Sequence, residues 1–385
     1  MPAFRRIPGS PHHVLIAGGG FAAAEAMLAL RALAGDRVAI DVVSPEDRLY
    51  YRPAATLEPF CGTEPLTLDL RELASDVGAT FRRDRLAAVA SDAQRVRLDS
   101  FAHLRYDSLL LAVGTARRVR VAGAVTFADQ RDVGRVRAVL DELARGEIRR
   151  IAFAIPGGVT WPLPIYELAL LTAAFADEHG LPAEVSIVTP ERRPLEVFGG
   201  AISARVRDAL ADRMVRFVGD VIPQAARRDG RLEVHFGDAI HADRVIAVPE
   251  LIGRRVSGVP AGWGGFVPVD RDARVLGLRD VFAAGDMTTH PVKQGGLATQ
   301  HADAAARAIA AGLGIEVAPQ PDDNVLEVRL AGADPPLVLS AALDATGRSV
   351  GAAVHRGARV MPGEKVLGRY LSPYLRERAR AATAA

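Results

Sequence analysis

The hydrophobic and polar positions of the chain predict an α/β fold. Short apolar runs, typical of buried parallel strands, end at glycine- or serine-containing turns, and longer helical segments follow several of them. The first run covers residues 14–17, ends in three consecutive glycines, and leads directly into an alanine-rich segment that extends to about residue 30. We expect a strand, a tight turn and a helix in this order.

The turn after this strand has the G-x-G-x-x-G/A spacing of dinucleotide-binding folds, with Gly18, Gly20 and Ala23 at the three small positions. Gly18 allows the sharp turn, Gly20 lets a pyrophosphate approach the backbone, and Ala23 lets the helix pack closely on the strand. Phe21 and Ala22 complete the helix N-terminus, whose free N–H groups and positive dipole end attract phosphate. A tight packing turn can have the same spacing, so its meaning depends on the rest of the chain.

Polar residues follow the second predicted strand, which covers residues 38–43. A nucleotide-binding fold usually carries an acidic group here for the adenosine ribose, and either Ser44 or Glu46 could take that role. The next loop contains Arg52 and Pro53 beside two tyrosines and is suited to border a large planar ring. Beyond it the pattern predicts a helix over residues 68–77, a strand pair around 81–89 and 95–99, and a buried strand over 106–115 that ends at Gly114 and Thr115.

The same plan then repeats. The second copy has predicted strands at 150–155 and 185–188, a glycine turn at 157–158, a helix over 166–178 and an apolar run at 242–249. The chain afterwards returns to the first unit with an apolar strand that stops at Gly285 and Asp286, and with a helix from Gly295 to about residue 311. Two divergent copies of one βαβ plan, the second inserted in the first, are therefore expected.

We accordingly predict two Rossmann-like dinucleotide-binding domains and a small α+β C-terminal region. The predicted boundaries are 1–118 and 250–315 for the two parts of the first domain, 119–249 for the second domain, and 316–385 for the C-terminal region. In the last of these the pattern predicts a strand pair at 325–330 and 337–342 and a final helical tail.

Composition excludes several classes of protein. The 385 residues are 49% hydrophobic and 24% charged, typical of an ordinary globular chain, and a net charge of +2 argues against a dedicated nucleic-acid binder. No apolar run reaches the length of a membrane span, and the N-terminus lacks the apolar core of a signal peptide, so we expect a cytoplasmic protein. Cys61 is the only cysteine, which excludes a redox-active dithiol and favours a packing role. No residue cluster predicts a metal site.

Lysine is rare in this chain. Of 48 Lys and Arg residues, only Lys293 and Lys365 are lysines. Lysine differs from arginine in its compact charge and readily shifted pKa, so these two positions are candidates for a specific role.

Four motifs in order resemble the FAD/NAD(P)-dependent pyridine nucleotide-disulfide oxidoreductase superfamily: GGGFAAAE at 18–25, YDSLLLAVGT at 106–115, the second glycine turn at 157, and FAAGD at 282–286. Two further stretches, PGGVTWPLPIYE at 156–167 and the pair PVKQGG and EKVLGRYL, resemble the sulfide:quinone reductase and type II NADH dehydrogenase branch. The resemblance implies an FAD cofactor.

The resemblance also implies roles for residues at both ends of the first domain. Gly18, Gly20 and Ala23 would contact the pyrophosphate, and Gly114 with Thr115 would close over the cofactor. Asp286, with Gly285 allowing the approach, would accept a hydrogen bond from a ribityl hydroxyl; a plain helix cap is the alternative. The segment Lys293, Gln294 and Gly295 would face the flavin N1–C2=O edge, where a helix dipole and an ammonium stabilise the negative charge of reduced flavin.

The chain departs from the family in two respects. Val159 and Thr160 stand where a sulfide-oxidising cysteine is expected, and no second cysteine exists, so a thiol relay is excluded. The second glycine turn is followed by two prolines, Pro162 and Pro164, which remove backbone donors from the helix start. We therefore do not expect conventional NAD(P)H binding. Glu191 could still contact a ribose, and Arg192 with Arg193 could contact a 2′-phosphate.

Three residues are candidate catalytic groups. Glu167, at the start of the second-domain helix, resembles a Tyr-Glu pair that related enzymes direct at the flavin, and we predict it as a proton carrier; a first-turn glutamate favoured by the helix dipole is the alternative. His290 is a second candidate proton donor, against the commoner case of an exposed loop histidine. Lys293 is the third.

These observations predict an FAD-dependent oxidoreductase that passes electrons to a small acceptor, with a quinone as the first candidate. An NAD(P)H:acceptor reductase with a modified nucleotide loop and a flavoprotein electron-transfer subunit are the alternatives. We expect the C-terminal tail to make at most weak peripheral contact with the inner face of the membrane. The donor, the binding of NAD(P)H and a homodimeric state are left open.

Overall fold

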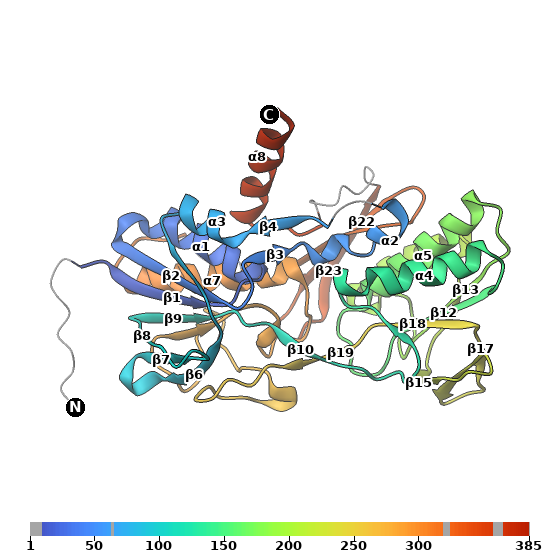
Figure 1. Cartoon of the computed structure of the whole chain (residues 1–385), viewed down its shortest axis with the longest axis horizontal. Helices are drawn as coiled ribbons and strands as arrows, with labels where there is room; N and C mark the ends of the chain where they lie inside the picture. The colour runs from blue at the N-terminus through green and yellow to red at the C-terminus, as the bar shows by residue number, and fades with distance from the viewer. Residues whose placement is uncertain (1–9, 63–64, 319–323, 357–364, 385) are drawn as a thin grey trace.

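The computed structural model describes residues 10–62, 65–318, 324–356 and 365–384. Two five-stranded sheets lie in separate lobes along the long axis of the molecule (Figure 1). The strands of each sheet pair in parallel register throughout. The two-lobed α/β architecture is the predicted fold class.

The sheet of the first lobe has the order β20-β9-β1-β2-β5. Its strands are β1 (His12–Ala17), β2 (Val38–Ser44), β5 (Thr80–Arg83), β9 (Ser108–Leu111) and β20 (Val281–Ala283). Because β20 pairs with β9, the chain returns to this sheet after completing the second lobe. The apolar run of β1 is fully buried, as its continuous hydrophobic pattern predicts.

Two helices, α1 (Phe21–Ala34) and α7 (Gly295–Gly312), pack against each other beside this sheet. Both are rich in alanine on their buried faces, and small side chains let two helix backbones approach closely. Their N-termini lie together, because a Cβ at Gly295, the first residue of α7, would be 3.5 Å from the ring of Phe21, the first residue of α1.

The first lobe is completed by short peripheral elements. They are β3 (Arg48–Tyr50), α2 (Glu58–Cys61), β4 (Thr67–Asp69), α3 (Leu70–Asp76) and the meander of β6 (Leu86–Ala90), β7 (Arg95–Leu98) and β8 (His103–Arg105). The predicted strand over 81–89 was wrong in extent: it divides into β5, which joins the parallel sheet, and β6, which pairs antiparallel with β7. The predicted helix over 68–77 begins only at Leu70, because the Asp69 side chain caps it by accepting from the backbone N–H groups of Arg71 and Glu72.

The sheet of the second lobe has the order β11-β18-β12-β13-β14. Its strands are β11 (Val125–Thr126), β12 (Arg150–Ala154), β13 (Glu184–Val188), β14 (Arg216–Val218) and β18 (Arg244–Ala247). The helices of this lobe are α4 (Val133–Ala144), α5 (Leu163–Glu178) and α6 (Gly200–Asp212). A small antiparallel sheet of β15 (Ile222–Ala226), β16 (Arg231–His235) and β17 (Ile240–His241) packs on the parallel sheet and shares a hydrophobic cluster with β12, β13 and β18.

Two antiparallel strands, β10 (Thr115–Arg118) and β19 (Glu250–Gly253), connect the lobes. They cross from one lobe to the other in the middle of the molecule (Figure 1). Residues of both strands, Arg118 of β10 and Glu250, Leu251 and Ile252 of β19, line a pocket that is described below.

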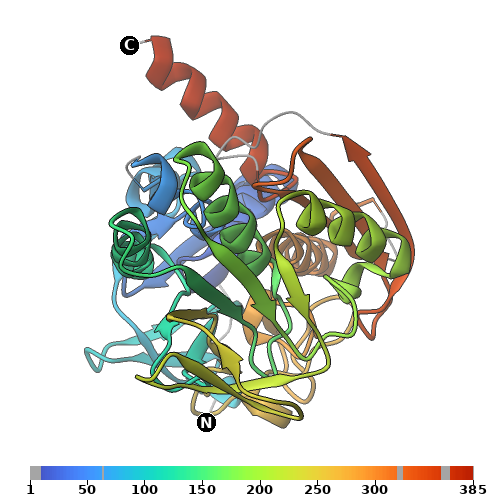
Figure 2. The same cartoon turned by 90° about the vertical axis from the view of Figure 1, so that its right-hand side faces the viewer.

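The C-terminal region contains an antiparallel sheet of β21 (Asn324–Leu330), β22 (Leu337–Leu343) and β23 (Ser349–Arg356) and the helix α8 (Leu371–Ala384). The sequence pattern predicted only the first two strands. The sheet shares a hydrophobic core with the second lobe, and α8 projects away from the body of the molecule (Figure 2). Among the described residues, no helix is both long enough and apolar enough to cross a membrane.

Candidate cofactor site

The first glycine turn has the backbone geometry of a phosphate-binding loop. Gly18 has a φ of +138°, and a Cβ atom there would lie 2.1 Å from the carbonyl oxygen of Ala112, so only glycine fits. A Cβ at Gly20 would meet nothing within 4 Å, so the space above this glycine is open. Gly20 directly precedes α1, whose free N–H groups face that open space.

The second glycine segment lies against the first. Gly285 has a φ of +76°, and a Cβ there would be 3.3 Å from Cβ of Ala22 and 3.2 Å from Cβ of Ala298. Residues that are more than 260 positions apart in sequence thus form one cradle at the N-termini of α1 and α7 (22 to 285). The side chain of Gln294 caps α7 by accepting from the N–H of Leu297 at 2.9 Å.

Asp286 is a carboxylate without a hydrogen-bonding partner among the residues that the structure describes. Burial raises the pKa of Asp286, while Lys293 and Arg52 oppose that rise. A half-buried acceptor of this kind suits a ligand that donates from hydroxyl groups. The ribityl chain of FAD offers such donors, so the residues present fit this cofactor.

Lys293 is buried beside this carboxylate. Its ammonium donates to the carbonyl oxygens of Thr288 at 2.5 Å and His290 at 2.6 Å, and lies 3.9 Å from the ring centroid of Phe266. Burial lowers the pKa of Lys293 to about 8, although the charge of Asp286 opposes this. The ammonium is thus held in place by the loop that leads into α7.

His290 lies in the same loop, and burial lowers its pKa below the usual value for histidine. Its Nε2 atom is 3.1 Å from the side-chain nitrogen of Asn324, and its ring centroid lies 4.6 Å from that of His301, with the two rings tilted by 57°. The proposed proton-donor role of His290 stays a prediction.

The predicted ribose end of the site is formed by Ser44 and Glu46. Ser44 is buried at the end of β2 and accepts from the N–H of Glu46 at 3.2 Å, whereas the Glu46 side chain is exposed. Gly114 has a φ of +67° with open space beside it, and the carbonyl oxygen of Thr115 accepts from Arg254 at 3.1 Å. Arg52 is exposed in the loop that follows β3.

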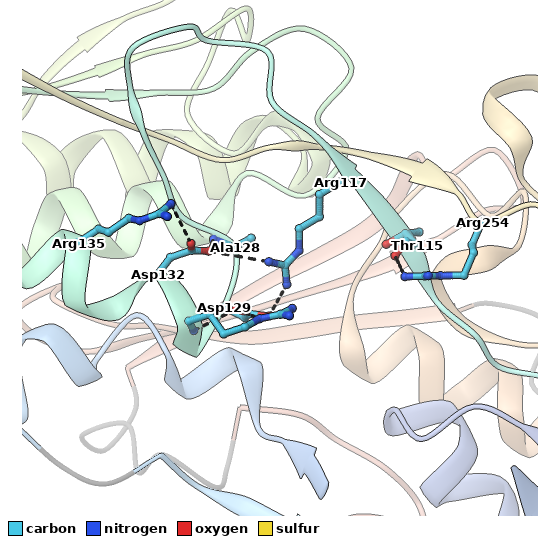
Figure 3. Close-up of polar contacts among 8 residues, drawn as sticks. Thr115, Arg117, Ala128, Asp129, Asp132, Arg135 and Arg254 are labelled. Atoms are coloured by element: carbon cyan, nitrogen blue, oxygen red, sulfur yellow. Dashed lines mark hydrogen bonds and ion pairs between the residues drawn. The ribbon is translucent and has the colours of Figure 1, made fainter. Parts of the chain in front are cut away.

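A cluster of arginines and aspartates, not predicted from the sequence, borders the site from the second lobe. Asp129, at 5% exposure, accepts from Arg117 of β10 and from Arg131 at 2.9 Å (Figure 3). Burial raises the pKa of Asp129, but these guanidinium groups outweigh burial and hold it below its usual range. Asp129 is the main cause of the raised pKa of Arg131, and Glu46 of the predicted ribose end adds to it as a smaller contribution.

Glu167 is part of a buried ion pair, a contact that the sequence did not predict. Both of its carboxylate oxygens accept from Lys365, at 2.8 and 2.7 Å, and the hydroxyl of Thr56 donates to it at 2.8 Å. The same ammonium reaches the carbonyl oxygen of Pro53 at 2.9 Å. Glu167 is 2% exposed and Lys365 6% exposed, so a proton held by this pair is shielded from bulk water.

The second glycine turn borders a pocket of about 220 Å³. Gly158, Thr160, Trp263 and Phe266 line it, together with the ion pair of Arg118 and Glu250. Phe266 also contacts Lys293, which connects this pocket to the cofactor site.

Glu191, the predicted ribose ligand of the second lobe, already has partners in the protein. It accepts from the hydroxyls of Tyr166 at 2.6 Å and Thr189 at 3.1 Å, and burial raises its pKa to about 7. A nucleotide ribose would have to compete with these contacts. The helix α5 begins with Pro162 as its N-cap and a further proline in its first turn, as the sequence predicted.

The sequence profile of the pyridine nucleotide-disulphide oxidoreductase family matches residues 12–312. The chain belongs to this family. Membership confirms that the protein is an FAD-dependent oxidoreductase, in agreement with the fit between FAD and the two glycine segments.

Known relatives carry related activities. The chain is 29% identical over 302 residues to the ferredoxin–NAD(+) reductase component of the anthranilate 1,2-dioxygenase system of Burkholderia cepacia, covering 72% of this chain and 68% of that protein. The sulfide:quinone oxidoreductase structure from Aquifex aeolicus matches with a TM-score of 0.78 at 18% identity, covering 96% of this chain and 90% of that one. A ferredoxin reductase from Rhodopseudomonas palustris matches with a TM-score of 0.67 at 19% identity, covering 86% and 82%. These likenesses confirm the fold.

Proposed function

We propose that this flavoprotein passes electrons through FAD to a quinone without a cysteine relay. The observation that carries the proposal is the convergence of Asp286, Lys293 and the start of α7 at one cradle, next to an apolar wall. That wall is the partly exposed ring of Phe21, which packs on a buried apolar cluster of Tyr51, Ala54 and Val366. A planar, weakly polar acceptor such as a quinone suits an apolar wall of this kind.

Bound FAD supplies two-electron transfer at this site. Lys293 and the N-terminus of α7 would stabilise negative charge on its reduced ring, because both place positive potential there. The ion pair of Glu167 and Lys365 would hold a proton for the acceptor oxygen. With Cys61 as the only cysteine, no step uses a thiol pair.

Stopped-flow oxidation of the photoreduced protein by a water-soluble quinone tests this proposal. We expect rapid return of the flavin absorbance in the wild type and a rate lower by about 10²-fold in Glu167→Gln, since a general acid contributes at least that much. Glu178→Gln, an exposed substitution on the same helix, is the matched control and should leave the rate unchanged. Failure of the reduced wild type to react with any quinone would contradict the proposal.

A second candidate is reduction by NAD(P)H with transfer to a carrier protein. The pocket beside Gly158 supports it, because Phe266, which lines this pocket, also contacts Lys293 of the candidate cofactor site. The Burkholderia cepacia relative, a ferredoxin–NAD(+) reductase component, points in the same direction. Two features count against it: the prolines at the start of α5, and the hydrogen bonds that Glu191 already accepts from Tyr166 and Thr189. Anaerobic bleaching of the flavin by NADH or NADPH within seconds would favour this candidate over the quinone proposal.

A further inference from the structure

We propose that Glu25 is a positioning residue that fastens residues 365–371, here called the strap, across the cofactor site. The inference rests on the proposed function, because the strap carries Lys365, the partner of Glu167. Glu25 belongs to α1, the helix that starts at the first glycine turn, and is not a member of the cradle itself.

Both oxygens of the Glu25 carboxylate accept hydrogen bonds from the strap. One oxygen accepts from the backbone N–H of Tyr370 at 2.8 Å and the other from that of Leu371 at 2.7 Å, at the start of α8. The side chain is 0% exposed. A Cβ at Gly368 would lie 2.5 Å from a Glu25 oxygen, so the absence of a side chain there is what admits the carboxylate.

The strap is held at further points by elements next to the candidate cofactor site. Its first half is bound to the loop after β3, because the N–H of Val366 donates to the hydroxyl of Tyr51 at 2.6 Å. Its middle is bound to α7, because the hydroxyl of Thr299 donates to the carbonyl oxygen of Leu367 at 2.8 Å. Glu25 supplies the third attachment, at the far end from Lys365.

The strap forms one wall of the cradle. A Cβ at Gly295 would lie 2.9 Å from a methyl group of Val366, so the strap rests directly on the N-terminus of α7. Lys365, the next residue back along the chain, reaches into the pair with Glu167. Displacement of the strap would thus move the apolar wall and the buried ammonium together.

Burying an ionisable carboxylate is costly, and a structural helix cap could be supplied by serine or threonine. The other charged groups near Glu25 are Asp303 and Arg307 of α7 and Arg369 of the strap. Arg307 and Arg369 both pair with Asp303, so the described contacts of Glu25 are all to backbone N–H groups. A two-oxygen acceptor holds two consecutive N–H groups at once, which fixes the direction in which the strap enters α8.

Lysine acetylation followed by mass spectrometry tests the fastening directly, because Lys293 and Lys365 are the only two lysines of the chain. In the wild-type protein both are buried and should react slowly. In Glu25→Ala we expect Lys365 to react about tenfold faster or more, as two charge-assisted hydrogen bonds are lost, while Lys293 stays protected. Glu25→Gln, which keeps one acceptor oxygen, should give an intermediate rate.

Glu72→Ala is the matched control. It removes the contact of Glu72 with Arg378 on the exposed part of α8 and leaves the strap untouched, so Lys365 should remain protected. The proposal is wrong if Lys365 stays protected in Glu25→Ala, or if Lys293 becomes reactive in parallel, which would indicate loss of the fold. Where Glu25→Ala does not fold, the same comparison of the two lysines in Glu25→Gln decides.

The rate of quinone reduction then separates this inference from the proposed function. Glu25→Ala and Lys365→Met should each lower the rate, and the double variant should be no slower than Lys365→Met alone, since Glu25 acts through Lys365. Additive losses would contradict a positioning role. If Lys365 becomes reactive in Glu25→Ala but neither variant changes the rate, the fastening holds and the proposed role of Lys365 fails.

Discussion

At the scale of single residues, Asp286 is the group on which the cofactor assignment depends most directly. Replacing it by asparagine should weaken FAD binding by about 1.5–3 kcal/mol, or roughly 10- to 100-fold in Kd, because a charged hydrogen bond is lost. The same change should raise the melting temperature of the cofactor-free protein, since a carboxylate without a partner among the described residues is removed. Fluorescence titration with FAD and thermal melts measure the two effects. Asp272→Asn, at an exposed loop position, is the control, and equal affinities in all three proteins would contradict the assignment.

Lys293 should raise the reduction potential of the bound flavin. Loss of its charge in Lys293→Met is expected to lower the potential by tens of millivolts, since 30 mV corresponds to about 1.4 kcal/mol for two electrons. The pKa of Lys293 is lowered to about 8, so the ammonium is charged below that pH and neutral above it. The difference between wild type and variant should therefore be full at pH 6.5 and shrink above pH 8. Spectroelectrochemistry that finds a pH-independent difference, or none, would refute this role.

Glu25 should make stability depend on pH in the opposite sense to a surface carboxylate. Burial raises its pKa in the folded state from 4.5 to about 7, so between these values the folded state binds a proton that the unfolded state has lost. The contribution of Glu25 to stability is full below pH 4.5 and falls as pH rises to 7, by on the order of 3 kcal/mol. Glu25→Gln cannot ionise, so urea denaturation should show it gaining stability relative to wild type between pH 5 and pH 7.5. A constant difference across that range would show that Glu25 does not titrate in this way.

The sequence could name candidate site residues where neighbouring residues decide the backbone geometry. Gly18, Gly20 and Asp286 lie in the turns that follow β1 and β20, and turn chemistry singles them out without long-range information, while their contact with the cofactor stays a prediction. The ion pair of Glu167 with Lys365 joins positions 198 apart, and the pair of Arg117 with Asp129 depends on how the lobes meet. No local pattern encodes such contacts, although the rarity of lysine singled out Lys365.

At the scale of elements, two substitutions in the first glycine turn should have different effects, one on the stability of the fold and the other on FAD binding. In Gly18→Ala the new Cβ would lie 2.1 Å from the carbonyl oxygen of Ala112, and alanine would have to adopt the φ of +138° that glycine has here. The cofactor-free protein should therefore be strongly destabilised. In Gly20→Ala the Cβ enters open space, so stability should be unchanged while FAD affinity falls. Thermal melts of both cofactor-free proteins, with FAD titrations, check the pair. Equal destabilisation in both, or unchanged affinity in Gly20→Ala, would contradict the assignment of the turn.

Elements with a strong apolar period were predicted well, and those that depend on tertiary partners were not. The parallel strands β1, β2 and β12 coincide closely with their apolar runs, whereas the strand predicted over 106–115 is shorter, because β9 covers only Ser108–Leu111 and Thr115 begins β10. The third C-terminal strand, β23, was missed because SVGAAVHR is weakly apolar and owes its extended form to pairing with β22. The division between β5 and β6 was missed because only the neighbouring strands reveal that one joins the parallel sheet.

At the scale of the whole molecule, the cofactor site depends on the return of the chain to its first lobe. β20 and α7 complete a sheet and a cradle begun by β1 and α1, and the strap reaches the same place from the C-terminal region. The repeat of the glycine-turn pattern predicted this inserted arrangement. The pairing of β10 with β19 and the ion pair of Arg117 with Asp129 could not be predicted, because they depend on the orientation of two separately folded sheets.

The most direct test is a count of flavin per chain. The purified protein, supplied with FAD and freed of excess by gel filtration, should show flavin absorbance near 450 nm at about one FAD per chain, and Asp286→Asn should retain markedly less under the same dilution. A colourless wild-type protein that refuses added FAD, or one that binds it equally well without the Asp286 carboxylate, would contradict the cradle formed by the two glycine segments.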